Sequence, residues 1–331
     1  MVSYYKIIKK EFFVMDNQTV DNKAKFFQNP IVLTLMALLC CALWGSATPA
    51  IKTGSKLLIP QGHVPSTMLF AGIRFFMAGI LTVIIYSVAR KKFLYPKKEN
   101  LARVGIVSCF QTIIQYIFFY VGLSNTSGVK GTIMSGTSTF FAIIISCFIF
   151  RMEKFGYKKL IACILGFAGI IIINLNGLTF TMNFTGDCFV IFSAVSLAVS
   201  SVLAKLFSKY EDPVVLSGYQ FILGGAVMII IGLIAGGEIS FSSTTGVAIL
   251  IYLAFLSAIA YSLWGVLLKY NPVSKVTVFS FTTPIFGTVL SLLLLTAEKP
   301  NVGAVNLIVT LVLVSAGILL LNYKKLPKAE K

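Results

Sequence analysis

The chain has 331 residues, of which 57% are hydrophobic and 12% charged, and its formal net charge is +17. Its mean hydropathy of +0.90 excludes a soluble domain of this length, because no core of that size could bury so much apolar surface. Continuous apolar runs such as Ile170–Ile173 and Leu292–Leu295 argue against β-barrel strands, which alternate apolar and polar residues. The sequence therefore predicts an all-α integral membrane protein.

The first 30 residues are polar and mixed in charge, and they lack the apolar centre and cleavage site of a signal peptide. From residue 31 onward, apolar runs of about 20 residues follow one another, the length that a helix needs to cross the hydrocarbon core. Ten spans are predicted, at about 31–51, 66–89, 101–121, 129–150, 157–175, 187–207, 213–235, 245–268, 275–297 and 303–322. Residues 1–30 and a basic tail, 324–331, are predicted to be short segments on the cytoplasmic side.

The distribution of the basic residues explains the net charge. With the N-terminus inside, the inner segments hold 23 of the 28 lysines and arginines, and the outer segments hold four. The remaining one, Arg74, lies within a span. This asymmetry follows the positive-inside rule and predicts that both termini are cytoplasmic, in the plasma membrane. The charge orients the protein in the bilayer, so no nucleic-acid partner is predicted.

The second half of the chain repeats the first at matching positions. At an offset of 145, Lys130, Thr132 and Ser135 fall on Lys275, Thr277 and Ser280, and at 146 Arg74-Phe75 falls on Gln220-Phe221. Five spans per half is an odd number, so the halves must enter the membrane in opposite orientations. The predicted fold is two inverted five-helix repeats, 31–175 and 187–323, around a central cavity.

Several short motifs recur in a fixed order along both halves. In the first half they are Trp44-Gly45-Ser46, Lys52, Arg74-Phe75, Glu153 and Gly166-Phe167-Ala168-Gly169; in the second they are Tyr219-Gln220, Tyr261-Ser262-Leu263-Trp264 and Glu298. In this order and duplication, residues 31 to 323 resemble EamA-type members of the drug/metabolite transporter superfamily. The resemblance implies ten helices, a central cavity, and export or exchange of small metabolites.

Two helical stripes of small and hydroxyl-bearing residues are candidate cavity walls. Ser135 and Thr139 lie on one stripe, and Ser280 and Pro284 lie on the matching one in the second half. The hydroxyls could also hold helices together by packing and hydrogen bonding. Pro284 removes a backbone hydrogen bond within its span, which predicts a kink beside the cavity.

Aromatic and amide side chains within the spans form a second set of candidates. Polar groups at membrane depth need partners, so they are expected to face either the cavity or neighbouring helices. The substrate-binding candidates in this set are Trp44, Gln111, Gln115, Tyr116, Tyr261 and Trp264.

Two cations complete the candidate site. Arg74 could contact a substrate carboxylate, or it could clamp helices together through backbone carbonyls. Lys52, at the end of the first span, could snorkel outward or point into the outer half of the cavity.

Absent motifs narrow the function. No carboxylate lies at the middle of a span, and no GxxxxGK[ST] segment is present, so neither obvious proton coupling nor direct use of ATP is predicted. The six cysteines and the single His63 form no metal-ligand pattern, and no cofactor or enzymatic activity is predicted. The leading prediction is a secondary transporter of a small polar or zwitterionic metabolite, such as an exporter of amino acids, working by alternating access. A lipid or lipid-precursor carrier and a non-transporting receptor or scaffold are the alternative functions. The sequence is also compatible with a homodimer.

Overall fold

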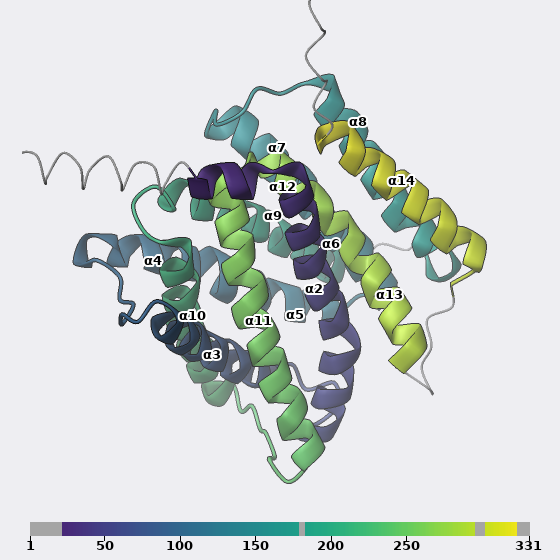
Figure 1. The fold of residues 1–331 in the computed structure, drawn as a ribbon. Helices are drawn as coiled ribbons and strands as arrows, with labels where there is room; N and C mark the ends of the chain where they lie inside the picture. The colour runs from purple at the N-terminus through teal and green to yellow at the C-terminus, as the bar shows by residue number, and fades with distance from the viewer. Residues whose placement is uncertain (1–21, 179–182, 295–301, 323–331) are drawn as a thin grey trace, which may run out of the picture.

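The computed structural model describes residues 22–178, 183–294 and 302–322. All regular elements in these ranges are helical (Figure 1). The first five spans correspond to α2 (Pro30–Leu58), α3 (Val64–Ala89), α4 (Leu101–Ser108) with α5 (Gln115–Ser124), α6 (Gly128–Gly136) with α7 (Ser138–Ile144), and α8 (Tyr157–Ile173). The other five correspond to α9 (Phe184–Phe207), α10 (Pro213–Ile234), α11 (Thr244–Tyr270), α12 (Val273–Thr277) with α13 (Thr283–Leu294), and α14 (Ala304–Asn322).

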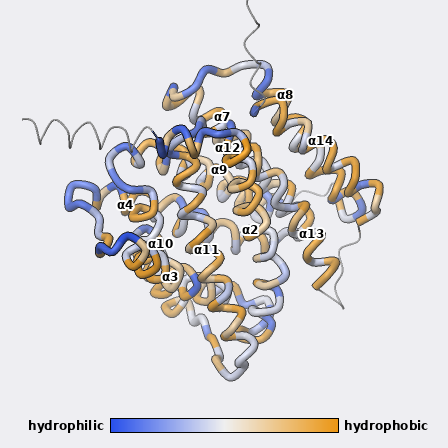
Figure 2. The backbone as a smooth tube through the Cα atoms, in the orientation of Figure 1, coloured by the Kyte–Doolittle hydropathy of each residue, from blue (hydrophilic) through white to orange (hydrophobic). Residues whose placement is uncertain are grey.

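Within the described ranges, nine of these spans are long and apolar enough to cross a membrane. The expected span at 157–175 is represented by α8, which has 17 residues and is shorter than the other nine. Apolar residues run along the helices, and hydrophilic residues gather in the connections at the bundle ends (Figure 2). Leu293 and Ile234, which are 74% and 82% exposed, belong to an outer surface that suits contact with lipid.

Local signals in the sequence set where several helices begin. The Asn29 side chain accepts a hydrogen bond from the backbone N–H of Ile31 at 2.9 Å, and Pro30 follows it as the first residue of α2. Asp212 and Pro213 repeat this arrangement at the start of α10, where the Asp212 carboxylate accepts from the N–H of Val214 at 2.8 Å. Each pair satisfies a helix N-terminus that would otherwise leave amide groups without partners.

The helices of the two repeats interlock. The first helix of each repeat packs against the third and fourth spans of the other: α2 contacts α11 and α13, and α9 contacts α5, α6 and α7. The second helices, α3 and α10, pack together, and so do the fifth helices, α8 and α14, which lie side by side at one edge of the molecule (Figure 1). In these contacts each helix of one repeat therefore packs against the same set of helices in the other repeat as its equivalent does in return.

Two glycines set the close approach of α3 and α10. A Cβ on Gly79 would lie 2.6 Å from the carbonyl oxygen of Gly218, and a Cβ on Gly225 would lie 2.4 Å from the backbone nitrogen of Phe76. Neither position has room for a side chain, as expected where small residues let membrane helices approach each other. Gly79 and Gly225 are themselves equivalent at the offset of 146.

Three spans are interrupted in the middle. A π-helical turn at Cys109–Ile114 separates α4 from α5, Thr137 separates α6 from α7, and a 3₁₀ segment at Val278–Thr282 separates α12 from α13. The interruption of the span that contains Pro284 comes before the proline rather than at it. Pro284 is the second residue of α13, directly after the 3₁₀ segment.

Candidate functional site

Four aromatic side chains meet between the two repeats. The rings of Phe75 and Phe221 stack with centroids 5.1 Å apart and an interplanar angle of 6°, and the hydroxyls of Tyr116 and Tyr261 are 3.0 Å apart. The equivalent pairs within each repeat lie at similar distances, with ring centroids 4.5 Å apart for Phe75–Tyr116 and 4.8 Å apart for Phe221–Tyr261. We call these four residues, with the two tryptophans described next, the central aromatic cluster.

Trp44 and Trp264 extend the cluster toward α2. The ring of Trp44 lies 5.2 Å from that of Tyr261 and 4.9 Å from that of Trp264, both in edge-on geometry. The indole Nε1 of Trp44 is buried and has no protein acceptor within hydrogen-bond distance. The structure therefore brings together four of the predicted site residues: Trp44, Tyr116, Tyr261 and Trp264.

Arg74 lies beside this cluster and is 4% exposed. Its guanidinium carbon is 4.4 Å from the centre of the Phe75 ring. Nε and Nη1 are buried and have no protein acceptor. These two nitrogens therefore do not clamp helices together through backbone carbonyls. A buried charge with unused hydrogen-bond donors is costly.

Two buried glutamines, Gln115 and Gln220, differ in their hydrogen bonds. Gln115, at the start of α5, is buried, and its Oε1 has no donor. Gln220, the repeat counterpart of Arg74, accepts a hydrogen bond from the Thr112 hydroxyl at 2.8 Å, while its Nε2 has no acceptor. The third predicted amide, Gln111, is half-buried within the π-helical turn. π-helical turns are frequent at functional sites, which keeps Gln111 a candidate.

Hydroxyl groups of the predicted stripes donate hydrogen bonds to backbone carbonyls. Ser135 is half-buried and donates to the carbonyl of Gly131 in its own helix at 2.7 Å. Thr139 is buried and donates at 3.3 Å to the carbonyl of Thr277, which belongs to the other repeat. Ser280 and Pro284 are half-buried. Ser135 and Thr139 thus follow the packing interpretation that the sequence left open.

Lys52 is exposed and lies within α2, which continues past the predicted end of the span to Leu58. Exposure is what the snorkelling alternative expects of this side chain.

A buried ion pair joins the repeats at one end of the bundle. Lys130 Nζ lies 2.6 Å from the Asp187 carboxylate, and these side chains are 9% and 0% exposed. The Thr126 hydroxyl and the N–H of Asn183 also donate to that carboxylate, at 2.5 and 2.9 Å. The sequence placed Lys130 in an outer connection, but its ammonium is buried against the first turn of α9.

A second polar network joins the repeats at the opposite end of the bundle. We call this the lysine-rich end, because it holds the connections between α3 and α4, α7 and α8, α9 and α10, and α11 and α12, and lysines lie in or beside each of them. The Glu153 carboxylate accepts from Lys159 Nζ at 2.7 Å and from the Ser274 hydroxyl at 2.5 Å. Burial alone would raise the pKa of Glu153, but the hydrogen bonds from Lys159 and Ser274 lower it below its ordinary value. Glu153 is therefore ionised at neutral pH.

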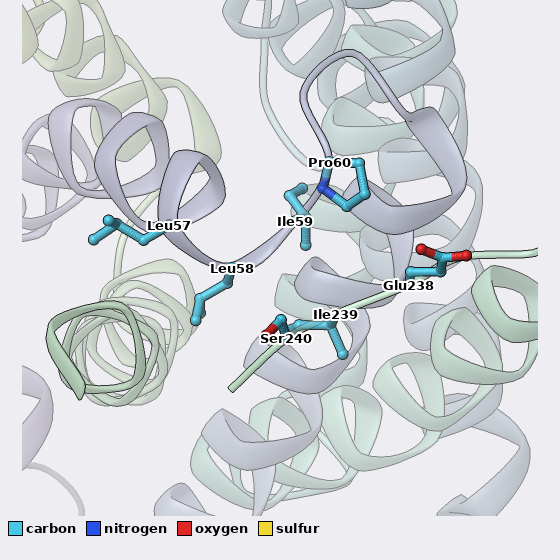
Figure 3. Close-up of a pocket in the computed structure, with 7 residues that line it drawn as sticks. All are labelled: Leu57, Leu58, Ile59, Pro60, Glu238, Ile239 and Ser240. Carbon is cyan, nitrogen blue, oxygen red and sulfur yellow. The ribbon is translucent and has the colours of Figure 1, made fainter. Parts of the chain in front are cut away.

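Two of the clefts on the surface of the described residues contain no residue of the central aromatic cluster. One, of about 330 Å³, is lined by Leu57, Leu58, Ile59, Pro60, Glu238, Ile239 and Ser240 (Figure 3). The other, of about 550 Å³, lies at the lysine-rich end around Glu153. Neither is lined by a predicted site residue. Among the described residues, no group of three His, Cys, Asp or Glu side chains could hold a metal ion.

Sequence reasoning omitted Phe75 and Phe221 from the site, although they stack at its centre. A signal for them was present, because the repeat at offset 146 covers Phe75 as well as Arg74. Residues on an axis that relates two repeats contact their own equivalents. Repeated aromatic pairs were thus better candidates than the hydroxyl stripes.

Comparison with known proteins places these features in a family. A model of the EamA-like transporter family matches this chain twice, over residues 32–175 and 184–323. The chain belongs to the EamA-like transporter family. It is a membrane transporter, and the EamA-type assignment made from the motifs is confirmed.

Similar proteins occur in plants, cyanobacteria and archaea. A chloroplastic WAT1-related protein of Arabidopsis thaliana is 26% identical over 286 residues, which are 81% of this chain and 65% of that protein. This chain therefore spans slightly less than two thirds of that relative. An uncharacterized transporter of Synechocystis is 26% identical over 311 residues, covering 87% of this chain and 89% of the relative. One of Archaeoglobus fulgidus is 26% identical over 298 residues, covering 88% and 97%.

A solved crystal structure has the same fold. It is 18% identical in sequence, matches with a TM-score of 0.72, and covers 87% of this chain and 96% of its own. At this identity the likeness describes the fold alone.

Proposed function

We propose that this EamA-like transporter is a secondary carrier, an exporter or facilitator, for a small polar or zwitterionic metabolite such as an amino acid. One observation carries the proposal. At the central aromatic cluster, which both repeats build, buried donors of Arg74 and Trp44 have no acceptor in the protein. Unpaired N–H groups in a membrane interior are costly, and a substrate carboxylate would satisfy them.

The same cluster suits the rest of such a substrate. Aromatic rings with a few fixed polar groups are the usual lining of small-molecule sites. Gln115 presents an acceptor, its Oε1, and we assign it to the substrate's ammonium or other donor group. We place Gln111, Tyr116, Tyr261, Trp264 and Ser280 along the same pathway. Thr139 and Pro284 border it where the helices of the two repeats meet.

We further propose ten spans arranged as inverted repeats, in the plasma membrane with both termini cytoplasmic. Contacts between equivalent residues support a pseudo-two-fold axis: Phe75 stacks on Phe221, and Tyr116 bonds Tyr261. The surplus of basic residues in the inner connections supports the orientation. Alternating access then requires the two polar networks, Lys130–Asp187 at one end and Glu153–Ser274 at the other, to open in turn.

The proposal is tested by binding measurements on purified protein with matched ligand pairs. Thermal stabilisation is measured with amino acids and with their methyl esters or amides, which lack the carboxylate. We expect the acids to stabilise the protein and the esters to fail, and Arg74→Gln, which copies the residue found in the other repeat, to weaken acid binding about tenfold or more. Stabilisation by lipid precursors instead of small acids would favour the lipid-carrier alternative.

Transport assays in proteoliposomes complete the test. Trp264→Ala and Gln115→Leu should reduce flux per folded molecule, whereas Leu293→Ala, on the exposed surface of α13, should not. If the first two substitutions lower thermal stability and leave flux unchanged, these residues are packing groups and the site assignment is wrong.

A further inference from the structure

The 550 Å³ cleft at the lysine-rich end is a polar site that the transport proposal does not use. It lies where the N-terminus of α8, the start of α12 and the C-terminal end of α14 come together, on the side of the molecule where α2 begins (Figure 1). Its lining residues are Met152, Glu153, Lys154, Gly156, Tyr157, Lys158, Lys159, Pro272, Ser274, Lys275, Leu320 and Leu321.

The charge of this cleft is strongly positive. Four of the lining residues are lysines, and Glu153 is the one acid among them. Glu153 is already neutralised, because Lys159 and the Ser274 hydroxyl donate to its Oε2 and the N–H of Ser274 lies 3.3 Å from its Oε1. The charges of Lys154 and Lys158 therefore exceed the negative charge of the lining.

The lysines of the lining come from both halves of the chain. Lys154 and Lys158 belong to the connection before α8 and its first turn, and Lys275 belongs to α12. Like charges held close together in one cleft repel each other, and an anion in the cleft would relieve that repulsion. The hydrogen bonds between Glu153 and Ser274 hold the two walls together, so the cleft is shaped before an anion arrives.

The cleft also lies at the edge of the lipid-facing surface. Leu160, Ile161 and Ile164 on α8 are 46%, 42% and 54% exposed, and Leu319 on α14 is 63% exposed. Tyr157, at the rim, is 71% exposed, in the position typical of an aromatic residue at a membrane interface. Leu320 and Leu321 give the cleft an apolar wall on the side of α14.

We propose that this cleft binds a phosphate group, supplied by the headgroup of an anionic phospholipid. Clustered lysines between transmembrane helices match the charge of such headgroups, and the neighbouring apolar surface can accompany the acyl chains. Bound there, the lipid bridges the α7–α8 connection of the first repeat and α12 of the second. It therefore stabilises the arrangement in which the lysine-rich ends of the repeats are joined.

The experiment compares three proteins in nanodiscs of phosphatidylcholine alone or mixed with phosphatidylglycerol. They are the wild type, the cleft variant Lys154→Gln/Lys158→Gln, and the control Lys92→Gln/Lys98→Gln, which removes the same charge from the exposed α3–α4 connection. We expect phosphatidylglycerol to raise the unfolding temperature of the wild type and control by roughly 2–4 °C. The cleft variant should show no such rise, although it should match the wild type in phosphatidylcholine.

A second arm separates lipid from soluble phosphate. Inorganic phosphate is titrated into the three proteins in neutral detergent, with chloride at equal ionic strength as the reference. Weak or absent stabilisation supports the lipid source, whereas full stabilisation that is lost in the cleft variant overturns it in favour of a soluble phosphate. An equal response of all three proteins to phosphatidylglycerol, or no response in any of them, overturns the site itself. Amino acid binding at the central aromatic cluster is measured separately, and its failure would leave this result standing.

Discussion

The hydroxyl groups of Tyr116 and Tyr261 lie 3.0 Å apart, and the two residues are separated by 145 positions, the offset at which the third span repeats in the eighth. Each tyrosine therefore hydrogen-bonds its own repeat equivalent. Phe75 and Phe221, which stack beside them, are related in the same way. A contact between equivalents is expected only near the axis that relates the repeats. Four of the substrate candidates, Trp44, Tyr116, Tyr261 and Trp264, thus gather where the two halves of the protein meet.

The tyrosine pair gives a double-mutant prediction. Tyr116→Phe and Tyr261→Phe should each lower the free energy of unfolding by about 0.5–1.5 kcal/mol, because each removes the shared hydrogen bond and keeps the ring. The double variant should cost less than the sum of the two single variants, since the bond can be lost only once. Unfolding of the four proteins in detergent measures this coupling. Fully additive losses would show that the hydroxyls have separate partners.

The glycine contacts between α3 and α10 predict a large steric effect. Gly225→Ala would place a methyl group 2.4 Å from the backbone nitrogen of Phe76, so the helices must separate. We expect a loss of stability of about 1–3 kcal/mol, the usual cost of overpacking. Gly105→Ala in α4 is the control, because its Cβ meets no atom within 4 Å. Thermal unfolding of both variants decides the matter, and equal stability would mean that α3 and α10 adjust freely.

The Lys130–Asp187 pair should be strongly coupled. Lys130→Met leaves the buried carboxylate of Asp187 with its bonds from Thr126 and Asn183 but without its counter-charge. The expected loss is roughly 3 kcal/mol, the lower end of the range for breaking a buried ion pair. The double variant Lys130→Met/Asp187→Leu should recover much of this loss, since it leaves no buried charge. Unfolding temperatures test this, and a double variant less stable than either single one would contradict it.

Glu153 predicts a dependence of stability on pH. Its pKa in the folded protein lies below the ordinary value, because the hydrogen bonds from Lys159 and Ser274 outweigh the effect of burial. Its stabilising contribution is therefore complete above the ordinary glutamate pKa of about 4.3 and is lost as the pH falls through the lower pKa of the folded state. Glu153→Gln should be less stable than the wild type at pH 7, and the difference should shrink in acid. A constant difference between pH 7 and pH 3 would show that Glu153 is not held in this way.

The sequence by itself determined the membrane class, the positions of the spans and the family. Apolar runs of about 20 residues must become helices in a bilayer, because only helices satisfy the backbone within one segment. The sequence also showed the offset between the repeats, because Arg74-Phe75 and Gln220-Phe221 keep the same order and spacing. These properties depend on local sequence and its periodicity, which need no knowledge of packing.

The tertiary structure alone decided which candidates meet and how they are bonded. Trp44, Tyr116, Tyr261 and Trp264 come together, whereas the Ser135 hydroxyl turns back to its own helix and Thr139 bonds a neighbouring backbone carbonyl. The sequence left Arg74 between a clamp and a ligand contact, and the structure leaves two of its donors without a protein acceptor. Helical periodicity places a side chain on a face of its helix, but the rotation and crossing of neighbouring helices decide what that face contacts.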